Sequence, residues 1–454
     1  MKSKFLKTSL LMSMMAFFAT TVNAQIEGYW KGDLNLGAQQ LGVCFNIQSK
    51  DGKFVSTMDV PAQGAFDVAV DETSFANDTL KIEITAINAS YCGVYANETI
   101  KGTFKQMGMS LPLNLARSEK EAKKSRPQDP KEPFNYRAEN VTFRNGKENF
   151  SLAGTLTIPE GEGPFPAVVL VSGSGQQNRD EELMNHRPFW VIADYLSRNG
   201  VAVLRYDDRG EGQSEGDPKM ATTMDLSYDA EAAFDFLLKQ KNIDAKKVGI
   251  LGHSEGGVIN CMVASRRKDV AFIVSLAGPA VKGMEVIKAQ QEAIYRVSGV
   301  PQETIDAANQ MTDMLYGIIG KTDNREDAAS QMKAMLAGFG MPEETIAQTV
   351  DPLTSPWMFY FLKYDPTENI VNTNCPALLL NGSLDLQVLA SQNLPAYEKI
   401  ISDYGKTNMT IREFPGLNHL FQHCTTGSPN EYVNIDETIS PEVLQTILEF
   451  IKGI

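Results

Sequence analysis

Histidine and cysteine are scarce in this 454-residue sequence, which has four of the first and five of the second. They form neither a C-x-x-C pair nor an H-E-x-x-H segment, the spacings that are typical of zinc sites. The acidic loop that runs to Asp217 also lacks the ligand spacing of an EF-hand. We therefore expect neither a metal ion nor another cofactor.

Positive charge is also in short supply. Lysine and arginine number 42 against 56 aspartate and glutamate residues, so the formal net charge is −14. Such a chain repels phosphate backbones, which disfavours nucleic-acid binding, and it offers no basic membrane-surface patch. With 43% hydrophobic and 22% charged residues, the sequence is that of a soluble globular protein. Its length favours two domains.

Long apolar runs are missing after the N-terminal segment, so no later stretch is expected to cross a membrane. At the N-terminus, three lysines precede a short apolar stretch at residues 10–19, and small residues follow at the usual cleavage positions. This pattern predicts a signal peptide over residues 1–24, cleaved after Ala24, and a periplasmic or secreted protein. An uncleaved anchor is the alternative. The oligomeric state is left open.

Export would expose the cysteines to an oxidising compartment. Cys44 and Cys92 both lie in the N-terminal region, and whether they pair stays open because the sequence does not give their Cα separation. Cys261 lies in an apolar helical run and is expected to be a buried thiol. Cys375 and Cys424 are unassigned.

The first part of the mature chain has the texture of a β-sheet. Residues 25–117 contain short segments with period-two alternation, separated by Gly, Asp and Asn, which predicts a small all-β accessory domain. Residues 118–135 are rich in charges and prolines without apolar periodicity, which predicts a linker.

From residue 136 to residue 454 the pattern changes to strands that alternate with helices. Several strands are uninterrupted apolar runs, which suits parallel strands covered on both faces. Alternation of this kind predicts a doubly wound, mostly parallel α/β sheet. Residues 136–454 are therefore the predicted catalytic domain.

A nucleophile elbow is predicted at Ser254. The segment 252–256 reads GHSEG, follows an apolar strand and precedes an apolar helix, which is the setting that G-x-S-x-G requires. The turn is so sharp that Cβ atoms two residues either side of the serine would clash, which explains the two glycines. An ordinary structural turn is the alternative interpretation of this pentapeptide.

A serine hydroxyl needs a base, and the base needs an acid to hold it. In this strand–turn–helix arrangement the chain order is Ser, acid, His, and only His419 and His423 follow Ser254. His419 lies in a loop between a strand and the final helix and is favoured as the base. His423 is expected to be a surface or helix-start residue. Asp385, just after the strand at 377–380, is the predicted acid.

Two backbone donors are expected to stabilise a developing oxyanion. One is the N–H of Glu255, the residue after the nucleophile, at the positive end of a helix. The other is expected in the small-residue loop after the first central strand, from Ser174 or Gly175, and the sequence does not decide between them.

Five segments together resemble the α/β-hydrolase family, and most of all its exported carboxylesterase branch related to serine aminopeptidase-type (S33-like) hydrolases. They are residues 172–175 (SGSG), 206–210 (YDDRG), 252–257 (GHSEGG), 382–385 (GSLD) and 416–419 (GLNH). In the N-terminal region, 28–32 and 58–64 resemble the front domain of exported esterases of Bacteroidetes type, although Asp59-Val60-Pro61 replaces the usual Asp-Ser-Pro. The resemblance implies a serine carboxylesterase that acts on small-molecule esters with short acyl groups, through an acyl-enzyme.

An insertion at about 281–365 is predicted to form a helical lid, because its Met- and Ala-rich segments have helical periodicity. Methionine and aromatic side chains there would line an adaptable apolar pocket. Two other functions stay open. One is a peptidase or amidase of the same fold, in which Glu255 would anchor a substrate amine. The other is a binding protein that has lost catalysis.

Overall fold

The computed structural model describes residues 26–35, 40–50, 52–106, 109–120 and 126–454. The predicted signal peptide lies outside these residues. The chain divides into two compact units between Lys124 and Ser125. Each unit is described here by itself.

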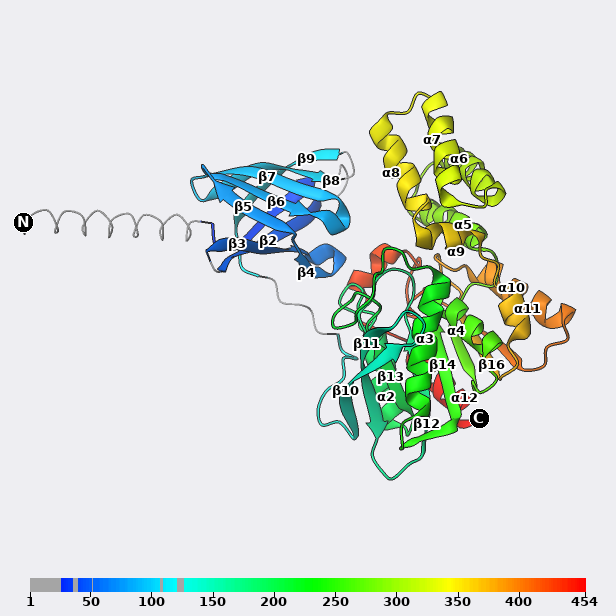
Figure 1. The fold of residues 1–454 in the computed structure, drawn as a ribbon. Helices are drawn as coiled ribbons and strands as arrows, with labels where there is room; N and C mark the ends of the chain where they lie inside the picture. Colours follow the sequence, from blue (N-terminus) through cyan, green and yellow to red (C-terminus); the bar gives the residue numbers. More distant parts are fainter. Residues whose placement is uncertain (1–25, 36–39, 51, 107–108, 121–125) are drawn as a thin grey trace, which may run out of the picture. The chain divides into compact units, whose positions relative to one another are not determined.

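Unit 1 is an antiparallel sheet of nine strands in the order β4-β3-β2-β1-β9-β8-β7-β6-β5 (Figure 1). The strands are β1 (Gly28–Asn35), β2 (Gln40–Lys50), β3 (Lys53–Val60), β4 (Ala65–Ala69), β5 (Glu72–Ala76), β6 (Thr79–Ile84), β7 (Ala89–Ala96), β8 (Thr99–Gln106) and β9 (Met109–Arg117). Short 3-10 turns lie at Pro61–Gln63 and Thr85–Ile87. The sheet curls until the hydroxyls of Ser56 on β3 and Thr73 on β5 lie 2.5 Å apart.

Alternation along the strands gives unit 1 one buried face. Trp30, Phe45 and Tyr91 are almost fully buried in a single apolar cluster. Cys44 is buried but lies outside this cluster, on the face of β2 opposite to Val43 and Phe45, whereas Cys92 is exposed and lies on a strand that is separated from β2 by three others. No disulfide joins them.

The two N-terminal motifs that carried the resemblance meet inside unit 1. The Tyr29 hydroxyl donates to Asp59 Oδ2 at 2.7 Å, and the backbone N–H of Asp67 donates to Asp59 Oδ1 at 2.6 Å. Asp59 is fully buried, and Lys120 Nζ lies 3.8 Å from it. These contacts satisfy a buried carboxylate, so the motifs stabilise the sheet.

Unit 2 contains a mixed sheet of eight strands in the order β10-β11-β13-β12-β14-β15-β16-β17. The strands are β10 (Tyr136–Asn145), β11 (Phe150–Pro159), β12 (Phe165–Val171), β13 (Ala202–Tyr206), β14 (Ile243–His253), β15 (Ile273–Leu276), β16 (Ala377–Gly382) and β17 (Met409–Phe414). The pairs β10–β11 and β11–β13 are antiparallel, and the remaining pairs are parallel. This is the mostly parallel α/β sheet that the alternating pattern predicts.

Helices cover both faces of this sheet (Figure 1). One apolar cluster joins α2 (Pro188–Arg198) and α12 (Pro441–Lys452) to the sheet. The other cluster joins α3 (Thr223–Leu238), α4 (Glu255–Arg266), α10 (Thr367–Asn372) and α11 (Ala390–Asp403). A further 3-10 helix lies at Pro429–Asn434. Burial on both faces explains why the parallel strands are continuous apolar runs.

The insertion between β15 and β16 contains five helices, α5 (Gly283–Val297), α6 (Gln302–Lys321), α7 (Arg325–Gly338), α8 (Glu343–Leu353) and α9 (Pro356–Lys363). They share an apolar core of their own, which includes Leu315, Met332 and Leu362. Among the described residues, no helix is both long enough and apolar enough to cross a bilayer.

The segment just before β10 is held tightly by unit 2, although it falls within the predicted linker. Arg126 is 1% exposed, and its guanidinium donates to the carbonyl oxygens of Met184, Val433 and Ile435. Asp129 accepts from Arg187 at 2.6 Å. A sequence signal could not reveal this, because Arg126 and Ile435 are 309 positions apart.

Candidate active site

Ser254 lies on the sharp turn between β14 and α4. Its φ is +54°, in the left-handed region that non-glycine residues seldom adopt. The turn is held by Ser254 N–H, which donates to the Leu276 carbonyl at 2.8 Å, and by Gly257 N–H, which donates to the Ser254 carbonyl at 2.9 Å. Strain kept in place by such contacts is common at functional residues.

The two flanking glycines are needed for the reason expected from the sequence. A Cβ at Gly252 would lie 1.9 Å from the Gly256 carbonyl oxygen, and a Cβ at Gly256 would lie 2.1 Å from the Val171 carbonyl oxygen. Both contacts are with backbone, which cannot move aside cheaply. Glycine therefore lets the serine turn pack against β12.

His419 and Asp385 meet at the same edge of the sheet, although they are 34 positions apart. His419 Nδ1 lies 2.7 Å from Asp385 Oδ2, and both side chains are buried. Asp385 Oδ1 accepts the N–H groups of Gln387 and Val388, each at 2.8 Å. This arrangement fixes the ring and leaves Nε2 as its free nitrogen.

His423 lies apart from these groups. Its side chain is 67% exposed, and its Nδ1 lies 2.8 Å from Glu437 Oε2. It does not line the cavity that contains Ser254 and His419. The structure therefore places His423 at the surface, as the sequence suggested.

A cavity of about 300 Å³ brings Ser254 and His419 together. Its apolar wall comes largely from the lid and neighbouring loops, namely Leu183, Pro279, Val286, Ile287, Trp357, Met358, Phe361, Val388 and Leu420. The polar lining consists of Ser174, Gln177, Glu181, His253, Gln290 and Gln387, together with Ser254 and His419. The volume is at the lower end of the range for small-molecule sites.

The predicted oxyanion donors come from the start of α4 and from the loop after β12. Glu255 is the first residue of α4, and Ser174 lines the cavity beside Ser254. Neither backbone N–H has a protein acceptor within the described residues. Gly175 lines a neighbouring hollow instead, so the geometry favours Ser174 over Gly175.

The neighbouring hollow has a volume of about 310 Å³ and shares Trp357 with the cavity. Trp357, on α9, donates from Nε1 to Glu255 Oε1 at 2.8 Å, and Thr223 donates to the same oxygen at 2.6 Å. Burial raises the pKa of Glu255, and these hydrogen bonds oppose that shift. The indole is thus a fixed wall between the two spaces.

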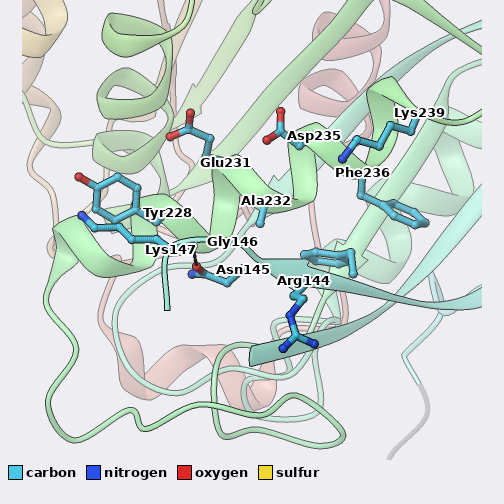
Figure 2. A pocket seen from close by; sticks show the side chains of 11 residues that line it. Arg144, Asn145, Gly146, Lys147, Tyr228, Glu231, Ala232, Asp235, Phe236 and Lys239 are labelled. Carbon is cyan, nitrogen blue, oxygen red and sulfur yellow. Dashed lines mark hydrogen bonds between the residues drawn. The ribbon is translucent and has the colours of Figure 1, made fainter. Parts of the chain in front are cut away.

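A third hollow, of about 510 Å³, lies away from these two spaces, between the β10–β11 turn and α3 (Figure 2). Its acids Glu231 and Asp235 already pair with Arg266 and Arg267. Lys147 lies 3.3 Å from the centroid of the Tyr228 ring. None of the predicted site residues lines this space.

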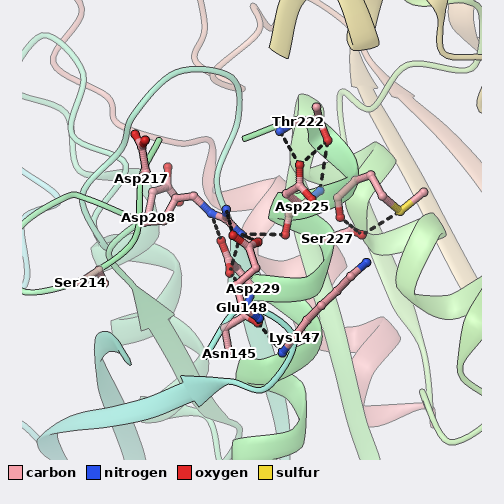
Figure 3. A network of polar contacts seen from close by, with 12 residues as sticks. Asn145, Lys147, Glu148, Asp208, Ser214, Asp217, Thr222, Asp225, Ser227 and Asp229 are labelled. Carbon is pink, nitrogen blue, oxygen red and sulfur yellow. Dashed lines mark hydrogen bonds and ion pairs between the residues drawn. The ribbon is translucent and has the colours of Figure 1, made fainter. Parts of the chain in front are cut away.

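A buried polar network braces the loops near the site. The Arg209 guanidinium lies 2.7 Å from Asp229 and 3.0 Å from Glu148, and Asn145 also donates to Asp229, as Figure 3 shows in part. Asp208 accepts from Ser172 Oγ and from the N–H of Gln177, each at 2.9 Å. Asp208 thereby fixes both ends of the loop that carries Ser174.

Comparison with known proteins identifies the family. The model of the X-Pro dipeptidyl-peptidase (S15) family matches residues 148–412, more than half of the chain. The chain belongs to the S15 family. The match includes Ser254 and Asp385 and ends before His419. It agrees with the predicted α/β-hydrolase family, whereas the finer S33-like assignment is not confirmed.

Individual proteins are similar to parts of this chain in sequence or in fold. Esterase EstD of Thermotoga maritima is 28% identical over 304 residues, which cover 66% of each chain. A peroxisomal succinyl-coenzyme A thioesterase of Mus musculus is 27% identical over 34% of this chain and 32% of its own. The alignments thus span just under two thirds of the first relative and about a third of the second. Among solved structures, the α/β hydrolase GrgF from Penicillium sp. sh18 has 18% identity and a TM-score of 0.44, over 70% of this chain and 98% of its own.

Two site residues were not predicted individually from the sequence. Glu181 reaches the cavity from the loop between β12 and α2, where no motif marks it. Trp357 stood out only as one of several lid aromatics, and its bond to Glu255 joins residues 102 positions apart.

Proposed function

We propose that this protein is a serine hydrolase that cleaves carboxylic esters with short, uncharged acyl groups. Ser254 is the nucleophile, His419 the base, and Asp385 the acid that orients it. The observation that carries this proposal is the single cavity that contains Ser254 and a His419 ring held through Nδ1 by a buried Asp385.

The reaction follows from these positions. Ser254 Oγ attacks the ester carbonyl carbon while His419 Nε2 takes the hydroxyl proton. The carbonyl oxygen becomes an oxyanion that accepts the N–H groups of Glu255 and Ser174. When the intermediate collapses, the alcohol leaves with the proton from His419. Water then attacks the acyl-enzyme by the same steps, which release the carboxylic acid and restore Ser254.

The lining of the cavity favours a neutral acyl group. Most of the wall is apolar, and three glutamines supply uncharged hydrogen-bonding groups. Among the described lining residues, Glu181 is the one carboxylate, and it already accepts from His253 and from the N–H of Gly173. A substrate ammonium would therefore meet no carboxylate without donors.

A dipeptidyl-peptidase is the second candidate, and the family match favours it. In this version Glu255 was expected to bind the substrate amine. Its Oε1 is instead engaged by Thr223 and Trp357, and Glu255 does not line the cavity. These contacts favour the esterase over the peptidase.

The proposed location of the reaction is the periplasm or the outside of the cell, and this proposal rests on the N-terminal sequence alone.

The test applies one covalent label and five chromogenic substrates to the full mature chain. Labelling with a fluorophosphonate reports an activated serine, and p-nitrophenyl acetate, butyrate, octanoate and laurate report the acyl preference. Glycyl-prolyl-p-nitroanilide reports the peptidase. We expect labelling and highest kcat/KM on the short esters. Faster turnover of the anilide would replace the esterase with the peptidase, and absence of labelling would remove both.

A further inference from the structure

His253, the residue before the nucleophile, has a hydrogen-bond acceptor at each ring nitrogen. Nδ1 lies 2.9 Å from Glu181 Oε1, and Nε2 lies 3.0 Å from the carbonyl oxygen of His419. The side chains of His253 and Glu181 are both nearly buried. A neutral imidazole carries one N–H and would leave one of these acceptors unmatched, whereas the imidazolium satisfies both.

The charges around His253 favour this imidazolium. Burial by itself lowers the pKa of His253, but the Glu181 carboxylate, the His419 carbonyl and the more distant Asp385 outweigh it, so the net direction is upward. The other titratable group against the ring is His419, whose ring centroid lies 4.7 Å away. On its other side His253 lines a small hollow together with the apolar side chains of Phe189, Leu276 and Leu420.

Glu181 extends the contact to the oxyanion side of the site. Its Oε1 also accepts the N–H of Gly173 at 2.8 Å. Gly173 is so close to the nucleophile that a Cβ there would lie 3.1 Å from the Cβ of Ser254. Glu181 adopts a φ of +51°, which aims its side chain inward from an otherwise irregular loop.

We propose that His253 and Glu181 form a charged positioning pair that holds two loops in place around Ser254. One is the loop that carries His419, and the other is the loop that carries Gly173 and Ser174. His253 fixes the backbone of His419, and Glu181 fixes Gly173, next to Ser174. This role rests on the proposed esterase function. The pair touches no reacting atom, so its effect passes through the placement of His419 and Ser174.

The charge on His253 also has a consequence for the pH profile. A buried cation in the site disfavours the uptake of a further proton close to it. In His253→Gln the cation is lost while the Glu181 carboxylate stays, so the site becomes more negative and the acidic limb of kcat/KM moves to higher pH. In Glu181→Gln the carboxylate that favours the imidazolium is lost, so His253 is neutral. The net charge of the pair is then unchanged, and the limb moves less.

The experiment measures kcat, KM and the pH profile of p-nitrophenyl butyrate hydrolysis for His253→Gln, Glu181→Gln and the double variant. We expect kcat to fall about 10- to 100-fold, because small displacements of reacting groups are costly, with KM within about threefold. We expect the acidic limb to move up by at least ~0.5 pH unit in His253→Gln and by less in Glu181→Gln. The double variant should lose little more than either single variant.

The surface pair His423–Glu437 gives a matched control, because it has the same residue types at the same Nδ1–carboxylate geometry. His423→Gln and Glu437→Gln should change neither kcat nor the limb. A lower melting temperature with an unmoved limb would assign His253 a structural role and overturn the proposal, as would wild-type kcat in both variants. If the unsubstituted protein hydrolyses no ester, the proposed function itself fails, and that result is separate from these.

Discussion

The two units place their polar groups in different ways. In unit 1, every strand pairs antiparallel with its neighbour, so the connections emerge at both ends of the sheet. Its buried Asp59 is satisfied by Tyr29 and by the N–H of Asp67. In unit 2, parallel strands end at one edge, and Ser254, Asp385 and His419 follow three of them. A parallel sheet gathers loops from distant parts of the chain, whereas the antiparallel sheet of unit 1 uses its buried polar groups to stabilise itself.

The largest effect is expected at Ser254, which lies on the strand-to-helix turn with a positive φ and is the proposed nucleophile. Ser254→Ala should keep the fold and lose at least ~10³-fold in kcat, as in other triad knockouts. Steady-state hydrolysis of p-nitrophenyl butyrate measures this, with circular dichroism as the control for folding. More than a tenth of wild-type activity would contradict the assignment.

The two histidines that follow β17 are expected to differ in their effect on turnover, because His419 lines the cavity and His423 is exposed. His419→Ala should lower kcat by a factor close to that of Ser254→Ala, because the hydroxyl loses its base. His423→Ala should stay within about twofold, because this exposed side chain pairs only with Glu437. Equal losses in the two variants would show that the base was wrongly chosen.

A smaller effect is expected at Trp357, which lies between the cavity that contains Ser254 and the neighbouring hollow of about 310 Å³. Trp357→Ala should join them and raise the laurate-to-butyrate ratio of kcat/KM about 10-fold, because the longer chain gains apolar surface to contact. Trp190→Ala is the matched control: Trp190 packs under Arg187 and lines neither space. A parallel fall on both esters would mean that Trp357 only supports the lid.

The smallest effect tests the comparison of the units directly. A chain that begins at Ser125 should melt cooperatively and keep kcat/KM on p-nitrophenyl acetate within about threefold, because unit 2 has its own core and contains the whole predicted triad. A chain that begins at Pro133 lacks Arg126 and should melt several degrees lower. A folded Ser125 chain without turnover would show that unit 1 contributes to the active site.

Local patterns in the sequence predicted the features that depend on local geometry. The elbow at Ser254 and the strand–helix alternation follow from glycine spacing and apolar runs. Chain order then left His419 and His423, and the position of His419 in a loop between a strand and the final helix favoured it. Contacts between distant side chains left no such pattern. Glu181 meets His253 across 72 positions, and Trp357 meets Glu255 across 102. Arg126 was predicted to lie in a linker because its charged neighbours resemble one, yet its Nη1 and Nη2 groups donate to the carbonyl oxygens of Ile435 and Val433, far along the chain.

The separate apolar core of the lid has a consequence for the evolution of this sequence. The buried side chains of α6, α7 and α8 pack with one another, so exchanges among the lid residues that face the cavity leave the packing of the eight-stranded sheet largely untouched. Mutations that alter substrate choice would then cost little thermodynamic stability and could accumulate one at a time. Selection can retune the lid while the sheet edge with the proposed catalytic serine, acid and base stays constant.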